Sequence, residues 1–155
     1  MKKMMFLFMI MSFSLLVSAQ ATDFSGKWKL NSAKSKLAAE YSMAPKELVI
    51  TQSGNDFAVE RHASFQDRDF TISDKFTLDG KECINKGWQD SEKKSTVVVS
   101  ADKKSLKITT TLAMGNNGTM TWTENFKIDG KNLVVEASST SSFGDRSETM
   151  VFDPE

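Results

Sequence analysis

The stretch from Met120 to Val135 constrains the fold more than any other part of the sequence. Its apolar residues recur at every second position, which is typical of a half-buried β-strand. The residues on the apolar side are Met120, Trp122, Phe126 and Ile128. Asp129-Gly130 supplies residues that tolerate positive φ in a tight turn, and a second strand follows it. Glu124 interrupts the apolar side, so a charged residue is expected inside the fold.

The same alternation recurs along the rest of the chain, with short connections rich in Gly, Asn and Asp. The predicted strands cover residues 24–30, 48–52, 57–65, 70–78, 82–85, 96–100, 106–112, 120–128, 133–137 and 146–152. Asp79-Gly80 predicts a tight hairpin between the fourth and the fifth of them. An antiparallel up-and-down meander of about ten strands avoids exposed edges best by closing into a barrel. The sequence therefore predicts an all-β fold, an antiparallel up-and-down β-barrel.

The segment after the first strand has a different pattern. Asn31 or Ser32 is a suitable helix cap, and apolar residues follow at helical spacing as far as Tyr41. Pro45 then ends the segment. This pattern predicts one short helical segment between the first and second strands.

The N-terminus has the three parts of a secretory signal peptide. Lys2 and Lys3 precede an apolar run from Met4 to Val17, and small residues follow at Ser18–Ala21. We expect a signal peptide at residues 1–21, cleaved after Ala19 or Ala21, and one barrel domain at residues 22–155. No cysteine lies at the junction, so the mature protein is expected to be periplasmic or secreted, without a stable membrane anchor.

Composition argues against several classes of function. Without Lys2 and Lys3, 18 basic residues face 20 acidic ones, so the chain lacks the positive charge of a nucleic-acid-binding protein. Cys83 is the single cysteine, which excludes an intrachain disulfide. His62 is the single histidine, in the opposite strand phase to Arg61, and its surroundings show no metal-ligand spacing. We therefore expect no metal, no cofactor and no enzymatic activity.

Several charged residues share the strand phase of the apolar majority. They are Arg61, Asp74, Glu124, Arg146 and Glu148. Unpaired charges are costly in a dry core, so these groups are expected to pair or meet water in a cavity. The alternative is that strand ends and bulges turn some of them to solvent. The predicted ligand-binding residues are the apolar Phe57, Phe76, Met120, Trp122, Met150 and Phe152, with Arg61, Asp74 and Glu124 as polar anchors.

Short motifs in the order of these strands resemble a known superfamily. Gly26-x-Trp28 on the first strand is similar to the calycins, the superfamily of lipocalins and fatty-acid-binding proteins. The run from Phe24 to Ser35 and the turn Asp79–Glu82 resemble exported bacterial lipocalin-like proteins. In the fatty-acid-binding branch the final strand carries Arg-x-Tyr, which holds the ligand carboxylate. The matching positions here are Met150 and Phe152, so the resemblance does not supply a carboxylate anchor.

The pattern and the resemblance together predict an exported protein that binds a small apolar or amphipathic ligand in a barrel cavity. Trp28 is expected to plug the floor of that barrel. The alternative is a protein-interaction or inhibitor module of the same fold, which would bind a protein partner through rim loops near Trp88 and Phe143.

Overall fold

The computed structural model describes residues 21–39 and 41–155, and ten strands form one antiparallel sheet in that part of the chain. The predicted signal peptide lies almost wholly outside the described residues. The strands are β1 (Gly26–Leu30), β2 (Glu47–Ser53), β3 (Asp56–Phe65), β4 (Arg68–Thr77), β5 (Cys83–Lys86), β6 (Glu92–Val99), β7 (Ser105–Ala113), β8 (Thr119–Asp129), β9 (Asn132–Ser141) and β10 (Gly144–Pro154). Within these ranges no helix has the length and apolar character needed to cross a membrane.

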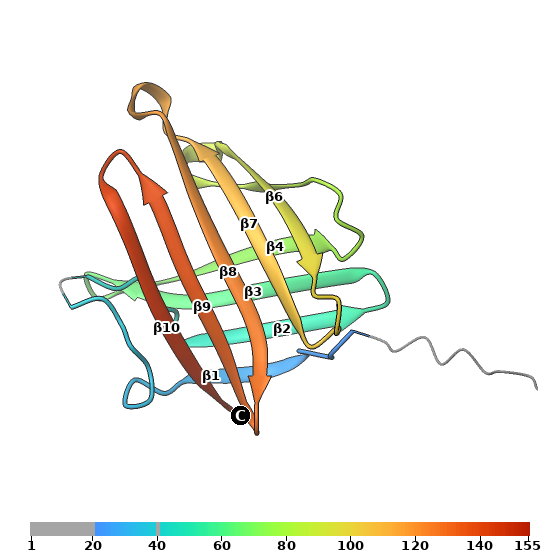
Figure 1. Ribbon diagram of the computed structural model, residues 1–155. Coiled ribbons are helices and arrows are strands. Elements are labelled where there is room, and N and C mark those ends of the chain that lie inside the picture. Colours follow the sequence, from blue (N-terminus) through green and yellow to red (C-terminus); the bar gives the residue numbers. More distant parts are fainter. Residues whose placement is uncertain (1–20, 40) are drawn as a thin grey trace, which may run out of the picture.

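The sheet curls into a nearly closed barrel. The strand order is β4-β3-β2-β1-β10-β9-β8-β7-β6-β5. Paired strands are therefore consecutive in sequence except β1 and β10, and the consecutive strands β4 and β5 stand at the two ends of the order. In Figure 1, strands β6 to β10 cross in front of β1 to β4 at a steep angle. The predicted all-β, up-and-down barrel is confirmed, because alternating strands with short connections can bury their apolar faces only by wrapping around a shared core.

The hairpin connections define the two ends of the barrel. Because the strands alternate in direction, the β3–β4, β7–β8 and β9–β10 loops lie at one end, which we call the open end. The β2–β3 and β8–β9 loops lie at the opposite, closed end. In the β8–β9 hairpin, Asp129 pairs with Asn132, and Gly130 in the two-residue loop has φ of 60°. The glycine supplies the positive φ that the turn requires.

The predicted hairpin at Asp79-Gly80 is wrong in one respect. The chain does turn there, but β5 pairs with β6 and shares no backbone ladder with β4. The Asn85 side chain bridges the two strands instead. Its amide oxygen accepts from the Lys75 backbone N–H at 2.8 Å, and its amide nitrogen donates to the Lys75 carbonyl at 2.9 Å. The Asn85 side-chain amide thus forms the two hydrogen bonds that a backbone peptide would form between β4 and β5. We call this junction of β4 and β5 the seam of the barrel.

The predicted helix after β1 is also wrong. In the described part of residues 31–46 the chain forms turns and one isolated β-bridge, because its backbone pairs with β10. Lys36 donates to the Thr149 carbonyl at 2.7 Å and accepts from the Thr149 N–H at 2.9 Å. The Ser35 hydroxyl also accepts from the Val151 N–H at 2.9 Å. These bonds use the groups that a helix would need, so tertiary pairing overrides the helical spacing.

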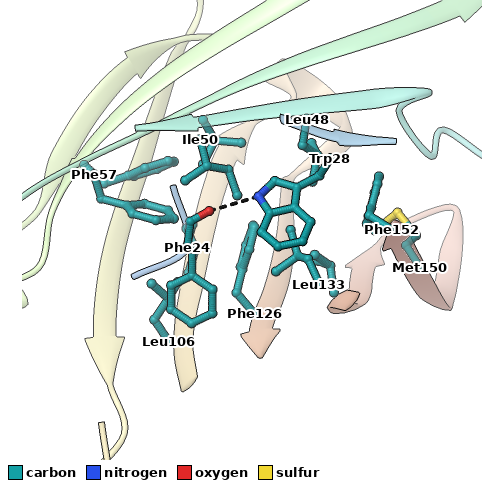
Figure 2. Close-up of a cluster of buried hydrophobic side chains, with 14 of the residues drawn as sticks. Phe24, Trp28, Leu48, Ile50, Phe57, Leu106, Phe126, Leu133, Met150 and Phe152 are labelled. Atoms are coloured by element: carbon teal, nitrogen blue, oxygen red, sulfur yellow. Dashed lines mark hydrogen bonds between the residues drawn. The ribbon is translucent and has the colours of Figure 1, made fainter. Parts of the chain in front are cut away.

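An apolar plug fills the closed end of the barrel (Figure 2). Its members include Phe24, Trp28, Ile50, Phe57, Leu106, Phe126, Leu133, Met150 and Phe152. Phe24 approaches Phe57 and Phe126 edge to face, with ring centroids 6.4 and 6.5 Å apart. The expected role of Trp28 agrees with its place in this plug.

The Gly26-x-Trp28 motif has a structural reason in the plug. The indole N–H of Trp28 donates to the Phe24 carbonyl at 3.0 Å, the dashed line in Figure 2. The chain must double back between these residues, and Gly26 makes the bend with φ of 143°. This conformation is unfavourable for a residue with a side chain. The glycine thereby lets Phe24 fold under the barrel and close it.

Candidate functional site

Four charged side chains from four strands meet inside the barrel, and we call them the ionic cluster. They are Arg61 on β3, Asp74 on β4, Lys93 on β6 and Glu124 on β8. Arg61 donates to Asp74 Oδ2 at 3.1 Å and to Glu124 Oε2 at 2.7 Å. Lys93 donates to the other Asp74 oxygen, Oδ1, at 2.5 Å. The four groups thus form one chain of ion pairs across the interior.

The ionic cluster lies directly on the apolar plug. On β8, Phe126 of the plug follows Glu124 on the inward side, and Trp122 precedes it toward the open end. On β4, Phe76 and Ile72 flank Asp74 in the same way. The cluster side chains are between 8% and 13% exposed. Such groups must be paired when they are this far from water, which accounts for the connected arrangement.

The ionic cluster separates the six apolar residues that were predicted to bind the ligand into two groups. Phe57, Phe76, Met150 and Phe152 belong to the plug and are at most 5% exposed. Since they are almost completely buried in the plug, they fill the closed half of the barrel. Met120 and Trp122 lie beyond the cluster, toward the open end, and both are partly exposed.

Trp122 is the best indicator of open space inside the barrel. It shares the inward phase of Glu124 and Phe126 on β8, a strand paired on both sides. Its ladder neighbours are Thr110, which is buried, and Ser139. An inward side chain on such a strand can reach solvent only through the interior or its mouth. The part of the interior between the ionic cluster and the open-end loops is here called the open half, and solvent reaches it beside Trp122.

Sequence reasoning missed three of the interior polar residues. Lys93, Ser95 and Thr110 are buried, and the Ser95 and Thr110 hydroxyls lie 2.8 Å apart in a hydrogen bond. The sixth strand was predicted to begin at residue 96, whereas β6 begins at Glu92. The signal was present, since Lys93 and Ser95 continue the period of Val97 toward the N-terminus. Lys93 was not recognised as an inward residue because the residues next to it in the sequence are polar too.

The two remaining charges of the predicted inward set lie near the mouth. Arg146 is exposed, and its guanidinium lies 5.6 Å from the centroid of the Tyr41 ring. Glu148 is partly buried and accepts from the Ala38 backbone N–H at 2.8 Å. Neither residue contacts the ionic cluster through a hydrogen bond or ion pair in the described part of the chain. Glu148 instead ties the segment after β1 to the rim.

The remaining titratable groups and surface depressions lie apart from the ionic cluster. Among residues 21–39 and 41–155, no three His, Cys, Asp or Glu side chains come together as a metal site. His62 pairs with Glu60 at 2.6 Å on the outside of β3. Two open depressions of about 490 and 470 Å³ also lie outside the barrel, and neither is lined by a member of the ionic cluster.

Three solved structures share the arrangement of strands seen in this chain. The zebrafish ileal bile acid-binding protein complexed with cholic acid matches 85% of this chain and 98% of its own, with a TM-score of 0.56 and 15% identity. A secretory abundant heat soluble protein from Ramazzottius varieornatus matches 88% of this chain and 100% of its own, with a TM-score of 0.60 and 13% identity. Lipid binding protein 8 of Caenorhabditis elegans, without ligand, matches 85% and 95%, with a TM-score of 0.55 and 13% identity.

Comparison of sequences adds no relative to this set. No family model matches the chain, and no curated protein sequence matches it. At 13–15% identity, the structural likeness concerns the fold. On that basis the chain shares with these structures the fold of a nearly closed antiparallel β-barrel.

Proposed function

We propose that this protein is an exported carrier that binds a small, largely apolar molecule in the open half of its barrel. The observation that carries the proposal is Trp122, an inward-facing and partly exposed aromatic side chain that precedes Glu124 on β8. An apolar surface beside a few convergent polar groups is the usual composition of a small-molecule site. The solved barrels of the same fold include a bile acid-binding protein and a lipid-binding protein.

The predicted site residues take different parts in this proposal. Met120 and Trp122 contact the ligand, and the ionic cluster of Arg61, Asp74, Lys93 and Glu124 forms the polar floor. Phe57, Phe76, Met150 and Phe152 lie below that floor in the plug. They hold the strands in register, so they act on the site through its shape. No catalytic group is required, because binding is non-covalent.

Export is part of the proposal and rests on the N-terminal sequence. The basic pair Lys2-Lys3, the apolar run and the small residues that follow have the pattern of a cleaved signal. A fusion of residues 1–21 to a reporter enzyme that is active only outside the cytoplasm tests it. Activity of the fusion, and its loss when Lys2 and Lys3 are deleted with part of the apolar run, supports export.

Two measurements test the carrier proposal. A native mass spectrum of the gently purified protein should show an adduct with the mass of a small organic molecule. A neutral apolar probe, N-phenyl-1-naphthylamine, should bind in a one-to-one complex with enhanced fluorescence.

Two variants test whether the probe binds inside the barrel. Met120→Arg sets a charged side chain in the open half and should abolish probe binding. Met43→Arg is the matched control, because Met43 is 62% exposed on the segment after β1. Equal probe binding by both variants, or no binding by the unmodified protein, contradicts the proposal.

The second candidate function is a protein-interaction module that acts through the open-end rim. It is favoured by the exposed aromatic Phe143, which is 74% exposed in the β9–β10 loop, and by the Tyr41–Phe65 pair with ring centroids 5.7 Å apart. This candidate predicts a protein partner in the native mass spectrum, released by Phe143→Ser. Phe143→Ser should leave probe binding unchanged if the barrel is a carrier.

A further inference from the structure

The ionic cluster contains equal numbers of positive and negative groups. Arg61 and Lys93 supply two cations, and Asp74 and Glu124 supply two anions. Glu124, Arg61, Asp74 and Lys93 follow one another in a single chain of contacts no longer than 3.1 Å. The floor of the open half is therefore neutral in sum when all four groups are ionised.

The hydrogen bonds inside the cluster use only part of its donor and acceptor capacity. Both oxygens of Asp74 are occupied, one by Arg61 and one by Lys93. Each terminal nitrogen of Arg61 donates one hydrogen to a carboxylate, so two of its five N–H donors are used. Glu124 Oε1 has no hydrogen-bond partner among the described residues, and Lys93 uses one of its three donors. What remains for a ligand is the Glu124 Oε1 acceptor, three N–H donors of Arg61 and two N–H donors of Lys93.

A charged head group does not suit this floor. A carboxylate would bring a third negative charge close to Glu124, and the arginine that would otherwise receive it is already held between two carboxylates. An ammonium group would bring a third positive charge that only Glu124 could face. Either charge would be uncompensated in a region where the existing charges are almost buried, which is unfavourable.

An uncharged polar group can pair with the free atoms at the Glu124 end of the cluster. A hydroxyl or a primary amide can donate to Glu124 Oε1 and accept from a free N–H of Arg61, which is bonded to the other oxygen of the same carboxylate. The neighbouring Ser95 and Thr110 hydroxyls bind each other and add no charge. The floor therefore favours a group that both donates and accepts.

We infer that the site selects amphipathic molecules with an uncharged, hydrogen-bonding head group, such as a long-chain alcohol or primary amide. It discriminates against the carboxylic acid and the amine of the same chain. This inference rests on the carrier function proposed above and adds the chemical class of the ligand. The residues that set the selectivity are Glu124 and Lys93, the two ends of the cluster.

The test is displacement of N-phenyl-1-naphthylamine by four ligands that share one hydrocarbon chain. These are oleyl alcohol, oleamide, oleic acid and oleylamine, compared at neutral pH. The alcohol and the amide should bind about tenfold or more tightly than the acid and the amine, a difference of about 1.4 kcal/mol or more. Because the chain is constant, the differences report the head group.

Two charge variants should change the preference in opposite directions. Glu124→Gln removes a negative charge and frees one side of Arg61, so binding of oleic acid should strengthen by about tenfold. Lys93→Met removes a positive charge, so binding of oleylamine should strengthen and that of oleic acid should weaken. Lys107→Met is the matched control, because Lys107 is exposed on the outer face of β7. It should leave all four affinities unchanged.

A double variant keeps the test valid if a single one unfolds. Glu124→Gln with Lys93→Met restores a neutral floor and should restore the preference for the alcohol. Circular dichroism and the urea midpoint of each variant show whether it is folded. If the unmodified protein binds the probe but prefers oleic acid, or if the variants leave the order unchanged, the inference is refuted while the carrier function stands. If no probe binds, the carrier function fails and the inference fails with it.

Discussion

Removal of Arg61 tests whether the interior ion pairs hold the barrel together. Arg61 makes two charge-assisted hydrogen bonds and is 13% exposed in its side chain. Arg61→Met keeps most of the apolar stem, leaves Asp74 with Lys93, and leaves Glu124 without a partner. Breaking a buried pair costs about 3–5 kcal/mol when the remaining charge is fully enclosed. Because Glu124 retains 12% exposure, the lower end applies, and we expect a loss of about 3 kcal/mol.

Urea unfolding followed by circular dichroism measures this loss. For a slope of about 2 kcal/mol per molar urea, the midpoint of Arg61→Met should fall by about 1.5 M without a change in slope. Arg68→Met is the control, since Arg68 is exposed at the start of β4. Its effect should stay within about 0.5 kcal/mol.

A double variant distinguishes ion pairing from packing. Glu124→Gln added to Arg61→Met removes the unpaired carboxylate, so the double variant should be more stable than Arg61→Met alone. The coupling free energy between the two sites should exceed about 0.5 kcal/mol. If the two effects add, or if Arg61→Met costs less than about 1 kcal/mol, the cluster does not stabilise the interior as reasoned here.

Three further perturbations test other parts of the fold. Gly26→Ala forces a side chain into φ of 143° and should lower the free energy of unfolding by about 1–3 kcal/mol in the same urea assay, whereas an unchanged midpoint would contradict the role of the bend. Asn85→Ala removes both bonds to the Lys75 backbone, so the Lys75 amide should exchange faster in hydrogen-exchange NMR, and unchanged protection would argue against a side-chain seam. Hydrogen bonds from Asn31, and then from Lys34, hold the pKa of Asp153 below its ordinary value of 3.8. A lowered folded-state pKa contributes stability above the unfolded pKa that is lost as the pH falls through the folded pKa. Asp153→Asn should therefore flatten the acid side of the stability profile below about pH 4, and an identical profile would refute this assignment.

The strands of this protein were predictable because the information for them is local. A half-buried strand needs an apolar side chain at every second position, and that requirement is visible in Phe57, Val59 and Ala63 or in Trp122 and Phe126. Short connections such as Gly130-Lys131 then leave few alternatives to antiparallel neighbours. Glu124, Asp74 and Arg61 were recognisable as interior candidates because each interrupts such an apolar series.

Other features depended on contacts between distant parts of the chain. The Lys36 backbone and the Ser35 hydroxyl bind β10, more than a hundred residues later, so the local helical spacing was not decisive. The seam between β4 and β5 is bridged by the Asn85 side chain, which strand patterns do not encode. Lys93 was overlooked because its local surroundings are polar, although it completes the ionic cluster through Asp74.

The alternation of residues determined which side chains face inward, since that depends only on the two-residue period of a strand. The height of each side chain within the barrel was decided by the tertiary structure, because height follows from strand tilt and cross-strand register. The strand period predicts both Phe57 and Trp122 to be inward-facing aromatic residues. Phe57 is buried in the plug, whereas Trp122 borders the open half. Barrel closure together with strand register placed two acids from β4 and β8 beside two bases from β3 and β6, and so produced a neutral floor from charges far apart in sequence.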